Sequence, residues 1–474
     1  MRTISTIFLL LFFSQTFAQQ NADDKYKKPL KQVLLELQTR FNVRIKFDNK
    51  MVADKWVMYA DWRYRENADA TLANILTPFD MKVNKENDST YKLKDYEYYR
   101  WSVEDGQKKL NELAALYNDK ATWEKRKATL KQQMLEALEI SPLPAKPASK
   151  TILANKRILG DYTIENFAIE MLPGVYVAGS IYKPAKIKGK IPVVLCPDGH
   201  WQACRYRPDC QYRCATLARL GTIAVSYDLF AWGESMLQFP YEDHRKSLAQ
   251  TIQVLNTIRI LDYMLTLPEA DTSRVAISGG SGGGSLTVLM TALDDRIKLS
   301  APVVSLSCYM YGGCPCESGM PIHFAGGGTD NVEIAAMAAP RPMLVVSDGQ
   351  DWTDHVPQIE MPYLKRMYGF YGKDALVQNV HLPTEGHDFG INKRTPLYKF
   401  IAANFGLDMK KITTASGDID ETKVTIEKEN AMYVFGDKGE KLPANAIKGF
   451  DALAKMFSEN GKLKIENWGD VGAN

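Results

Sequence analysis

The sequence predicts an α/β protein whose larger part is a doubly wound, mostly parallel sheet. One observation is that apolar strands alternate with helical segments over about 250 residues from Thr151 onward. The other is a strand, residues 274–277, that runs into a glycine-rich turn at 278–285 and then into helix-forming residues 286–290. A strand, a tight turn and a helix in this order are typical of such a sheet.

The first eighteen residues have the pattern of a signal peptide. Arg2 supplies a positive start, residues 7–17 are mostly apolar, and Ala18 is a small residue before a cut at Gln19. This stretch is too short to span a bilayer, and no later segment is long and apolar enough to do so. We therefore expect a periplasmic or secreted protein without a membrane span.

Length and charge narrow the class of protein. A chain of 474 residues can form two or three domains. Its net charge is only +3, and lysine and arginine are interspersed with aspartate and glutamate. A nucleic-acid partner, which would require a concentrated basic surface, is not expected.

Residues 28–97 are predicted to form a small α/β module. Helical spacing over 30–41 and 68–79 flanks an alternating strand at 43–47, and a hairpin pairs 81–83 with 91–93. The pattern resembles the short N-terminal domain of secretins and TonB-dependent receptors. That resemblance implies a docking role, with a possible protein partner, rather than chemistry.

Residues 102–148 are predicted to be a helical linker. The segment is heavily charged, its apolar residues recur at steps of three and four, and Pro142, Pro144 and Pro147 end it. We expect an amphipathic helix pair packed on the larger domain, residues 151–406. Strands of that domain are expected at 162–170, 175–182, 191–196, 222–228, 275–277, 301–304, 342–347 and 380–382, with helices at 249–267 and 395–405. A C-terminal extension, 407–474, is expected to pack back on it.

The glycine-rich turn has the pattern of a nucleophile elbow, Gly-x-Ser-x-Gly. Ser281 is its central residue, and Gly279 and Gly283 stand where a side chain would clash. A Walker loop would require a lysine after its last glycine, and a dinucleotide fingerprint would require a third glycine at the correct spacing. Neither is present, and a flexible linker would not lie between a strand and a helix.

A serine hydroxyl requires a base and a carboxylate that orients the base. His387 follows the last predicted strand in a short glycine-flanked loop, which makes it the candidate base among six histidines. Asp351 is the candidate acid in the loop after 342–347, with Asp348 and then Asp354 as alternatives. The chain order serine, aspartate, histidine is that of α/β-hydrolases.

Several further stretches within 151–406 strengthen the resemblance to α/β-hydrolases. They are residues 192–200, Asp228 with 233–235, 261–263 leading to 271–274, 339–342, 351–353 and 385–387. Together with the elbow they resemble an α/β-hydrolase of the dienelactone-hydrolase and acetyl-xylan-esterase type. The resemblance implies a serine esterase that forms an acyl-enzyme and removes small acyl groups, acetyl above all, from carbohydrate without a cofactor.

The same resemblance implies where substrate is held. The oxyanion hole would take one backbone N–H from Gly282 and another from His200 or Trp201. The candidates to stack on a small-molecule or oligosaccharide ester are Trp201, Tyr206, Trp232 and Trp352. Residues 312–323 resemble a loop of secreted relatives, in which Glu317 either faces substrate or accepts hydrogen bonds within a disulfide-stapled loop.

The cysteines are expected to be structural. In an oxidising compartment six of the seven could form disulfides, and Cys196 would be left buried in a strand. Paired Cys-x-x-Cys clusters are absent, so no metal site is expected. The six are Cys204, Cys210, Cys214, Cys308, Cys314 and Cys316.

Two other functions fit parts of the pattern. A serine peptidase of the prolyl-oligopeptidase group shares the elbow and the order of the three residues, but the segment before residue 151 lacks the many short strands of a propeller. A catalytically inactive hydrolase fold that binds a partner through the N-terminal module is the other alternative. Activity that is lost in Ser281→Ala would distinguish the enzyme from that binding protein.

Overall fold

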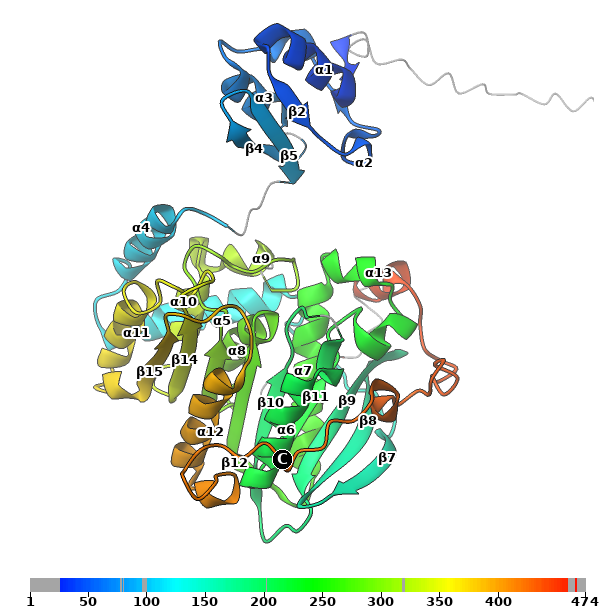
Figure 1. Cartoon of the computed structure of the whole chain (residues 1–474), viewed down its shortest axis with the longest axis vertical. Coiled ribbons are helices and arrows are strands. Elements are labelled where there is room, and N and C mark those ends of the chain that lie inside the picture. The colour runs from blue at the N-terminus through cyan, green and yellow to red at the C-terminus, as the bar shows by residue number, and fades with distance from the viewer. Residues whose placement is uncertain are drawn as a thin grey trace, which may run out of the picture. The chain divides into compact units, whose positions relative to one another are not determined.

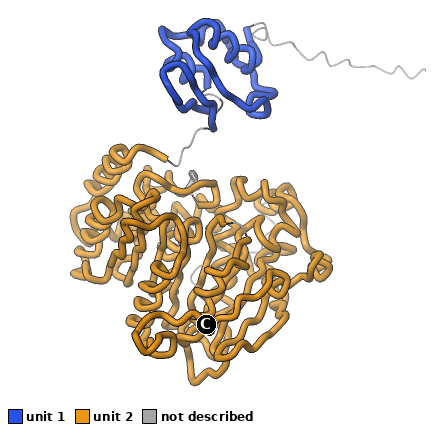
Figure 2. The backbone as a smooth tube through the Cα atoms, in the orientation of Figure 1, with its two compact units in different colours: residues 1–98 blue, residues 99–474 orange. Residues whose placement is uncertain are grey.

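The computed structural model describes residues 26–76, 79, 81–95, 100–201, 203–317, 320–458 and 465–466. The predicted signal peptide lies outside these residues. The chain divides into two compact units, residues 1–98 and residues 99–474 (Figure 2). Among the described helices, none has the length and apolar character that crossing a bilayer requires.

The first unit has the predicted order of helix, strand, helix and hairpin. Its main elements are α1 (Leu30–Phe41), β2 (Arg44–Lys46), α3 (Ala68–Leu76), β4 (Met81–Asn87) and β5 (Thr90–Asp95). The sheet has the order β2-β5-β4, in which β5 pairs parallel with β2 and antiparallel with β4. Its own apolar core is built mainly from α1 and α3.

The predicted amphipathic helix pair is present at the start of the second unit. It consists of α4 (Val103–Ala114) and α5 (Lys120–Ala137), each with a side-chain N-cap, Ser102 and Asp119. Trp123 of α5 is fully buried. Arg126 forms two hydrogen bonds of 2.9 Å with the carboxylate of buried Glu333. The pair is therefore packed into the second unit.

The predicted mostly parallel sheet forms the centre of the second unit (Figure 1) and has nine strands, one more than predicted. The strand order is β15-β14-β13-β12-β10-β11-β9-β8-β7, and only the β11-β9-β8-β7 end is antiparallel. The strands are β7 (Ile152–Leu159), β8 (Tyr162–Leu172), β9 (Val175–Pro184), β10 (Ile191–Pro197), β11 (Ile223–Tyr227), β12 (Ala270–Gly280), β13 (Leu299–Val303), β14 (Met343–Asp348) and β15 (Val377–Leu382). The edge strand β7 was not among the predicted strands.

Helices cover both faces of this sheet. Val193 and Leu195 of β10 belong to one core, and Val194 and Cys196 belong to the other. Residues of α7 (Ala249–Thr266) and α8 (Gly282–Leu293) fill the first core, and residues of α6 (Pro208–Leu220) and α12 (Ile391–Phe405) fill the second. Burial on both faces explains why these strands are continuous apolar runs.

The C-terminal extension packs back on the sheet, as predicted. Val434 and Phe435 form a small core with residues of β8 and β9. Their backbone N–H groups donate hydrogen bonds to the buried carboxylate of Glu234 in η5 (Gly233–Leu237). Farther on, α13 (Phe450–Ser458) contributes Leu453 and Phe457 to the main core.

The disulfide prediction was largely wrong. In the structure Cys314 is bonded to Cys316, whereas Cys204, Cys210, Cys214 and Cys308 have free thiols. Cys196 is also free, as expected. Cys210 and Cys214 lie one turn apart on α6, and their side chains fill the core on one face of the sheet together with Cys196. Their role there is packing.

Candidate active site

Ser281 lies in the predicted turn between β12 and α8. Its backbone has φ 54° and ψ −124°, a conformation that is strained for a residue with a Cβ atom. A Cβ atom on Gly279 would lie 2.5 Å from the backbone of Gly283, and one on Gly283 would lie 2.5 Å from the carbonyl oxygen of Pro197. The two glycines therefore permit the close packing that holds the turn in place.

Three side chains distant in sequence form one hydrogen-bonded chain. The hydroxyl of Ser281 donates to Nε2 of His387 over 2.9 Å. Nδ1 of the same imidazole donates to Oδ2 of Asp351 over 2.7 Å. The structure thus brings together the predicted serine, histidine and first-choice aspartate.

The loop after β14 holds the carboxylate of Asp351 in position for its hydrogen bond with His387. Its Oδ1 accepts hydrogen bonds of 2.6 Å from both the backbone N–H and the hydroxyl of Thr353. Burial opposes ionisation, but the hydrogen bonds from His387 and Thr353 outweigh it, and the pKa of Asp351 lies below its ordinary value. Asp351 is therefore a carboxylate that can stabilise a positively charged imidazole.

Asp348 has a different environment. It is the last residue of β14, is fully buried, and lies 3.3 Å from Nζ of Lys393. Burial and the adjacent carboxylate of Asp351 raise the pKa of Asp348 to about 6 despite Lys393. Asp354, the third candidate, accepts a hydrogen bond from the hydroxyl of Tyr309.

The predicted oxyanion donors lie beside the serine. Gly282 is the first residue of α8, where backbone N–H groups have no partner within the helix. The segment after β10 passes close to it, because a Cβ atom on Gly199 would lie 2.9 Å from Cβ of Ser281. The ring of His200 packs against Gly282, where an added Cβ atom would lie 2.5 Å from its Cε1.

Two of the predicted aromatic residues lie beside the imidazole. The ring centroids of Trp352 and Trp201 are 4.4 Å and 5.5 Å from that of His387. Trp232 instead lies 5.6 Å from the ring of His200 and 5.7 Å from that of His244. Trp352 and Trp201 can thus shape the space around the imidazole of His387. Trp232 packs instead against the rings of His200 and His244.

Glu317 takes the second of its two predicted roles, that of an internal hydrogen-bond acceptor. Its carboxylate is buried and accepts from the backbone N–H of Gly313 over 3.0 Å and from the hydroxyl of Ser285 over 3.3 Å. Nδ1 of His200 lies 3.0 Å from its Oε1. Nδ1 of the His200 ring is therefore already engaged by Glu317, and Nε2 faces other residues.

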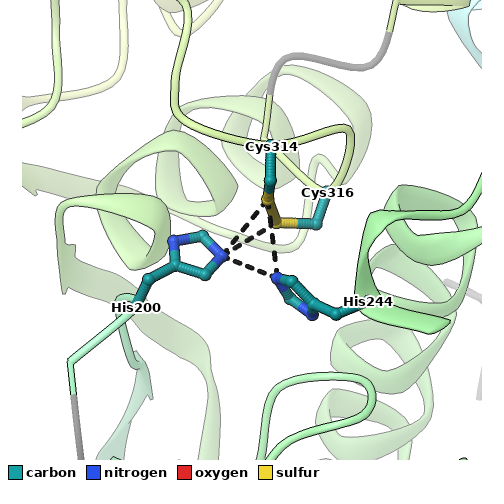
Figure 3. A group of neighbouring side chains, drawn as sticks. All are labelled: His200, His244, Cys314 and Cys316. Atoms are coloured by element: carbon teal, nitrogen blue, oxygen red, sulfur yellow. Dashed lines mark hydrogen bonds between the residues drawn. A yellow bond between two sulfur atoms is a disulfide. The ribbon is translucent and has the colours of Figure 1, made fainter. Parts of the chain in front are cut away.

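Beyond His200 lies a group that the sequence did not reveal. Nε2 of His200 is 2.7 Å from Nε2 of His244 and 2.9 Å from Sγ of Cys316, and Cys314 completes the group (Figure 3). His244 was not assigned a role because its surrounding residues match no motif. The only signal in the sequence was the closely spaced Cys-Pro-Cys at 314–316.

The fold and the hydrogen-bonded chain together define a class. The serine stands after the strand β12, the aspartate after β14 and the histidine after β15, at the carboxyl ends of parallel strands. This topology, the strained turn and the order of the three residues are those of an α/β-hydrolase with a Ser-His-Asp arrangement.

Comparisons with known proteins identify the family more closely. The structure of methylesterase BT1017 is 50% identical in sequence, with a TM-score of 0.79, and the match covers 93% of this chain and 98% of that one. The chain therefore belongs to the same family of α/β-hydrolase esterases as methylesterase BT1017, and it is a carboxylic ester hydrolase.

Two further matches cover less of the chain. The family model of acetyl xylan esterase matches residues 242–310. Acetyl esterase Axe7A of Xylanibacter ruminicola is 29% identical over 138 residues, which is 26% of this chain and 30% of that protein. The chain thus matches less than a third of the length of this relative.

Proposed function

We propose that this protein is a serine esterase that hydrolyses small esters carried on carbohydrate through an acyl-enzyme. The observation that carries the proposal is the hydrogen-bonded chain from Ser281 through His387 to Asp351. Its distances are those of a nucleophile within reach of its base and a base held by its carboxylate.

The proposed reaction follows from these contacts. Nε2 of His387 takes the proton from Ser281 as Oγ attacks the ester carbonyl carbon, and Asp351 stabilises the resulting imidazolium. His387 then gives that proton to the departing alcohol. In the second half of the reaction, His387 takes a proton from the water that attacks the acyl-enzyme. It returns that proton to Oγ of Ser281 as the acid leaves.

Negative charge on the carbonyl oxygen requires its own donors. We assign the backbone N–H of Gly282 and a backbone N–H of His200 or Trp201 to this role, because both segments lie beside Ser281. Loss of one such donor typically costs about 3 kcal/mol of transition-state stabilisation.

For the substrate, we propose first a methyl ester of a carboxylate on a sugar chain. The support is the relative that is half identical over nearly its whole length and is named a methylesterase. Methanol would then leave, and the acyl group on Ser281 would be the sugar acid. The indole rings of Trp201 and Trp352 offer apolar faces on which a sugar ring could stack beside the imidazole.

An acetyl ester on carbohydrate is the second candidate. It is favoured by the match of the acetyl xylan esterase model and by the partial match to an acetyl esterase. Acetyl would then be the acyl group on Ser281, and a sugar hydroxyl would leave.

One experiment separates these possibilities. Wild type and Ser281→Ala are incubated with a methyl-esterified polyuronate, with acetylated xylan and with aminoacyl anilides. The released methanol, acetate and aniline are measured. We expect methanol from the first substrate with wild type alone. Acetate without methanol would favour the second candidate, and hydrolysis of aminoacyl anilides would favour the peptidase. Equal activity of Ser281→Ala on every substrate would refute the serine mechanism.

We also infer that residues 1–18 direct export and that residues 28–97 dock a partner. The support is the charge and apolar pattern of the first stretch and the small fold of the second, whose core is separate from that of the esterase. N-terminal sequencing of the protein from its native host, with Gln19 as the expected first residue, tests the export signal.

A further inference from the structure

Four side chains beside the active site form a ligand set typical of a metal centre. Their potential ligand atoms, Nε2 of two histidines and Sγ of two cysteines, all lie within 4.8 Å of one another (Figure 3). His200 follows β10, His244 lies in η6 (Tyr241–Arg245) after β11, and Cys314 and Cys316 follow β13. These are parallel strands of one sheet, so their carboxyl ends bring the four residues to the same edge.

Hydrogen bonds outside the group orient both imidazoles. Nδ1 of His200 lies 3.0 Å from a carboxylate oxygen of Glu317, and Nδ1 of His244 lies 2.5 Å from the carbonyl oxygen of Phe230. Neither oxygen can donate a proton, so each Nδ1 carries the N–H. Each neutral ring then presents the lone pair of its Nε2 to the centre of the group.

This is the arrangement found around histidines that bind metals. Such histidines donate their other ring N–H to a carboxylate or a backbone carbonyl, which sets the tautomer and the ring orientation. Here the two Nε2 atoms face each other over 2.7 Å. With both protons on Nδ1, no proton lies between the two lone pairs, and a cation at the centre would remove their repulsion.

We propose that His200, His244, Cys314 and Cys316 bind one Zn²⁺ ion when the two cysteines are reduced. Two thiolates and two imidazoles form a Cys₂His₂ set, which selects zinc over the hard cations that prefer oxygen. Tetrahedral zinc with Zn–N bonds near 2.0 Å places its two nitrogens about 3.3 Å apart, so the rings would separate slightly.

The charges of the ion and its four ligands balance. Zinc binding forms two Zn–S bonds, breaks two S–H bonds and releases two protons. The ion with two thiolates and two neutral imidazoles has no net charge, which suits a site in which His244, Cys314 and Cys316 are buried.

The structure has the two sulfurs joined in a disulfide, and the same sulfurs cannot be thiolates at the same time. A newly synthesised chain carries both as thiols and can bind zinc directly. From the disulfide, a thiol reductant must first supply two electrons and two protons.

Four protein ligands leave no open position for water or substrate, so the site is structural. It would connect the segments that follow β10, β11 and β13. One of these carries His200, whose ring packs against Gly282 at the start of α8. Zinc would therefore hold together the loops beside Ser281 without taking part in the reaction.

The test measures metal in the mature chain. Wild type is produced with added zinc and purified in the presence of a phosphine reductant. Unbound metal is removed, and the zinc content per chain is measured by elemental mass spectrometry. We expect about one zinc per chain. In the double variant Cys314→Ser with Cys316→Ser the content should fall to near zero. Cys308→Ser is the control, because it removes a buried thiol outside the group and should leave the zinc in place.

Two further measurements test the proposal even if the double cysteine variant folds poorly. Cobalt substitution of wild type should give the absorption of tetrahedral Co²⁺ with thiolate ligands. A chelator should lower the melting temperature of wild type and leave that of the folded double variant unchanged. Wild type that stays free of zinc under reductant, or a double variant that keeps its zinc, would overturn the proposal.

Discussion

Asp348 and Asp351 show how neighbouring residues of one type acquire different roles. Asp348 ends β14, where its side chain is buried beside Lys393, and its pKa is raised. Asp351 lies beyond the turn, where His387 and Thr353 stabilise its charge. Three residues of separation are enough, because the chain leaves the sheet between them.

The first prediction concerns the charge of Asp351. Asp351→Asn should reduce kcat on the order of 10⁴-fold, because an amide no longer holds the Nδ1–H tautomer of His387 or stabilises its cation. Steady-state kinetics on p-nitrophenyl acetate measure the effect. Asp354→Asn, in the same loop, should retain most of the activity. If the two variants lost activity equally, the assignment of Asp351 would be wrong.

At the scale of an element, the strand-turn-helix at Ser281 depends on the absence of side chains. Gly283→Ala should lower both the melting temperature and kcat, because its Cβ atom would lie 2.5 Å from the carbonyl oxygen of Pro197, a backbone atom of β10. Gly369→Ala is the matched control, since no atom lies within 4 Å of its added Cβ. A Gly283→Ala enzyme with unchanged melting temperature and kcat would contradict this packing.

The contact between η5 and the C-terminal extension should depend on pH. Burial, with the nearby carboxylate of Asp228, raises the pKa of Glu234 from 4.5 to about 7 although Arg205 opposes this. The folded state therefore binds a proton that the unfolded state has released. Stability from this group is complete below pH 4.5 and is lost as the pH rises to 7, by about 3 kcal/mol.

Glu234→Gln isolates this effect, because glutamine does not titrate. Urea unfolding at pH 5, 6, 7 and 8 gives the free energy of unfolding of both proteins. Wild type should lose stability relative to Glu234→Gln as the pH rises. If the difference in unfolding free energy between the two proteins stayed constant from pH 5 to 8, Glu234 would not bind this proton in the folded state.

At the scale of the whole molecule, the candidate active site lies entirely within residues 99–474. Ser281, Asp351 and His387 all belong to that unit, and the core of the first unit shares no residue with those of the second. A chain that begins at residue 99 should keep kcat and KM on p-nitrophenyl acetate within about twofold. A tenfold loss with the truncated chain still folded would give the first unit a part in catalysis.

The central strands that were predicted correctly have uniform burial. Strands such as β10 read as apolar runs because helices cover both of their faces. The strand β7 was missed because it lies at the sheet edge and half of its residues are exposed, including the polar Asn155 and Lys156. Its pairing with β8 decides its conformation, and that pairing is not visible in its own composition.

The sequence by itself determined the serine turn, its two essential glycines, and a histidine and an aspartate that follow parallel strands. These follow from local stereochemistry, because only glycine fits the close approaches around Ser281. Only the tertiary structure decided that Cys314 and Cys316 meet His200 and His244, and that Cys210 and Cys214 pack in a core. Such encounters depend on which strands become neighbours, and no short stretch of the chain contains that information.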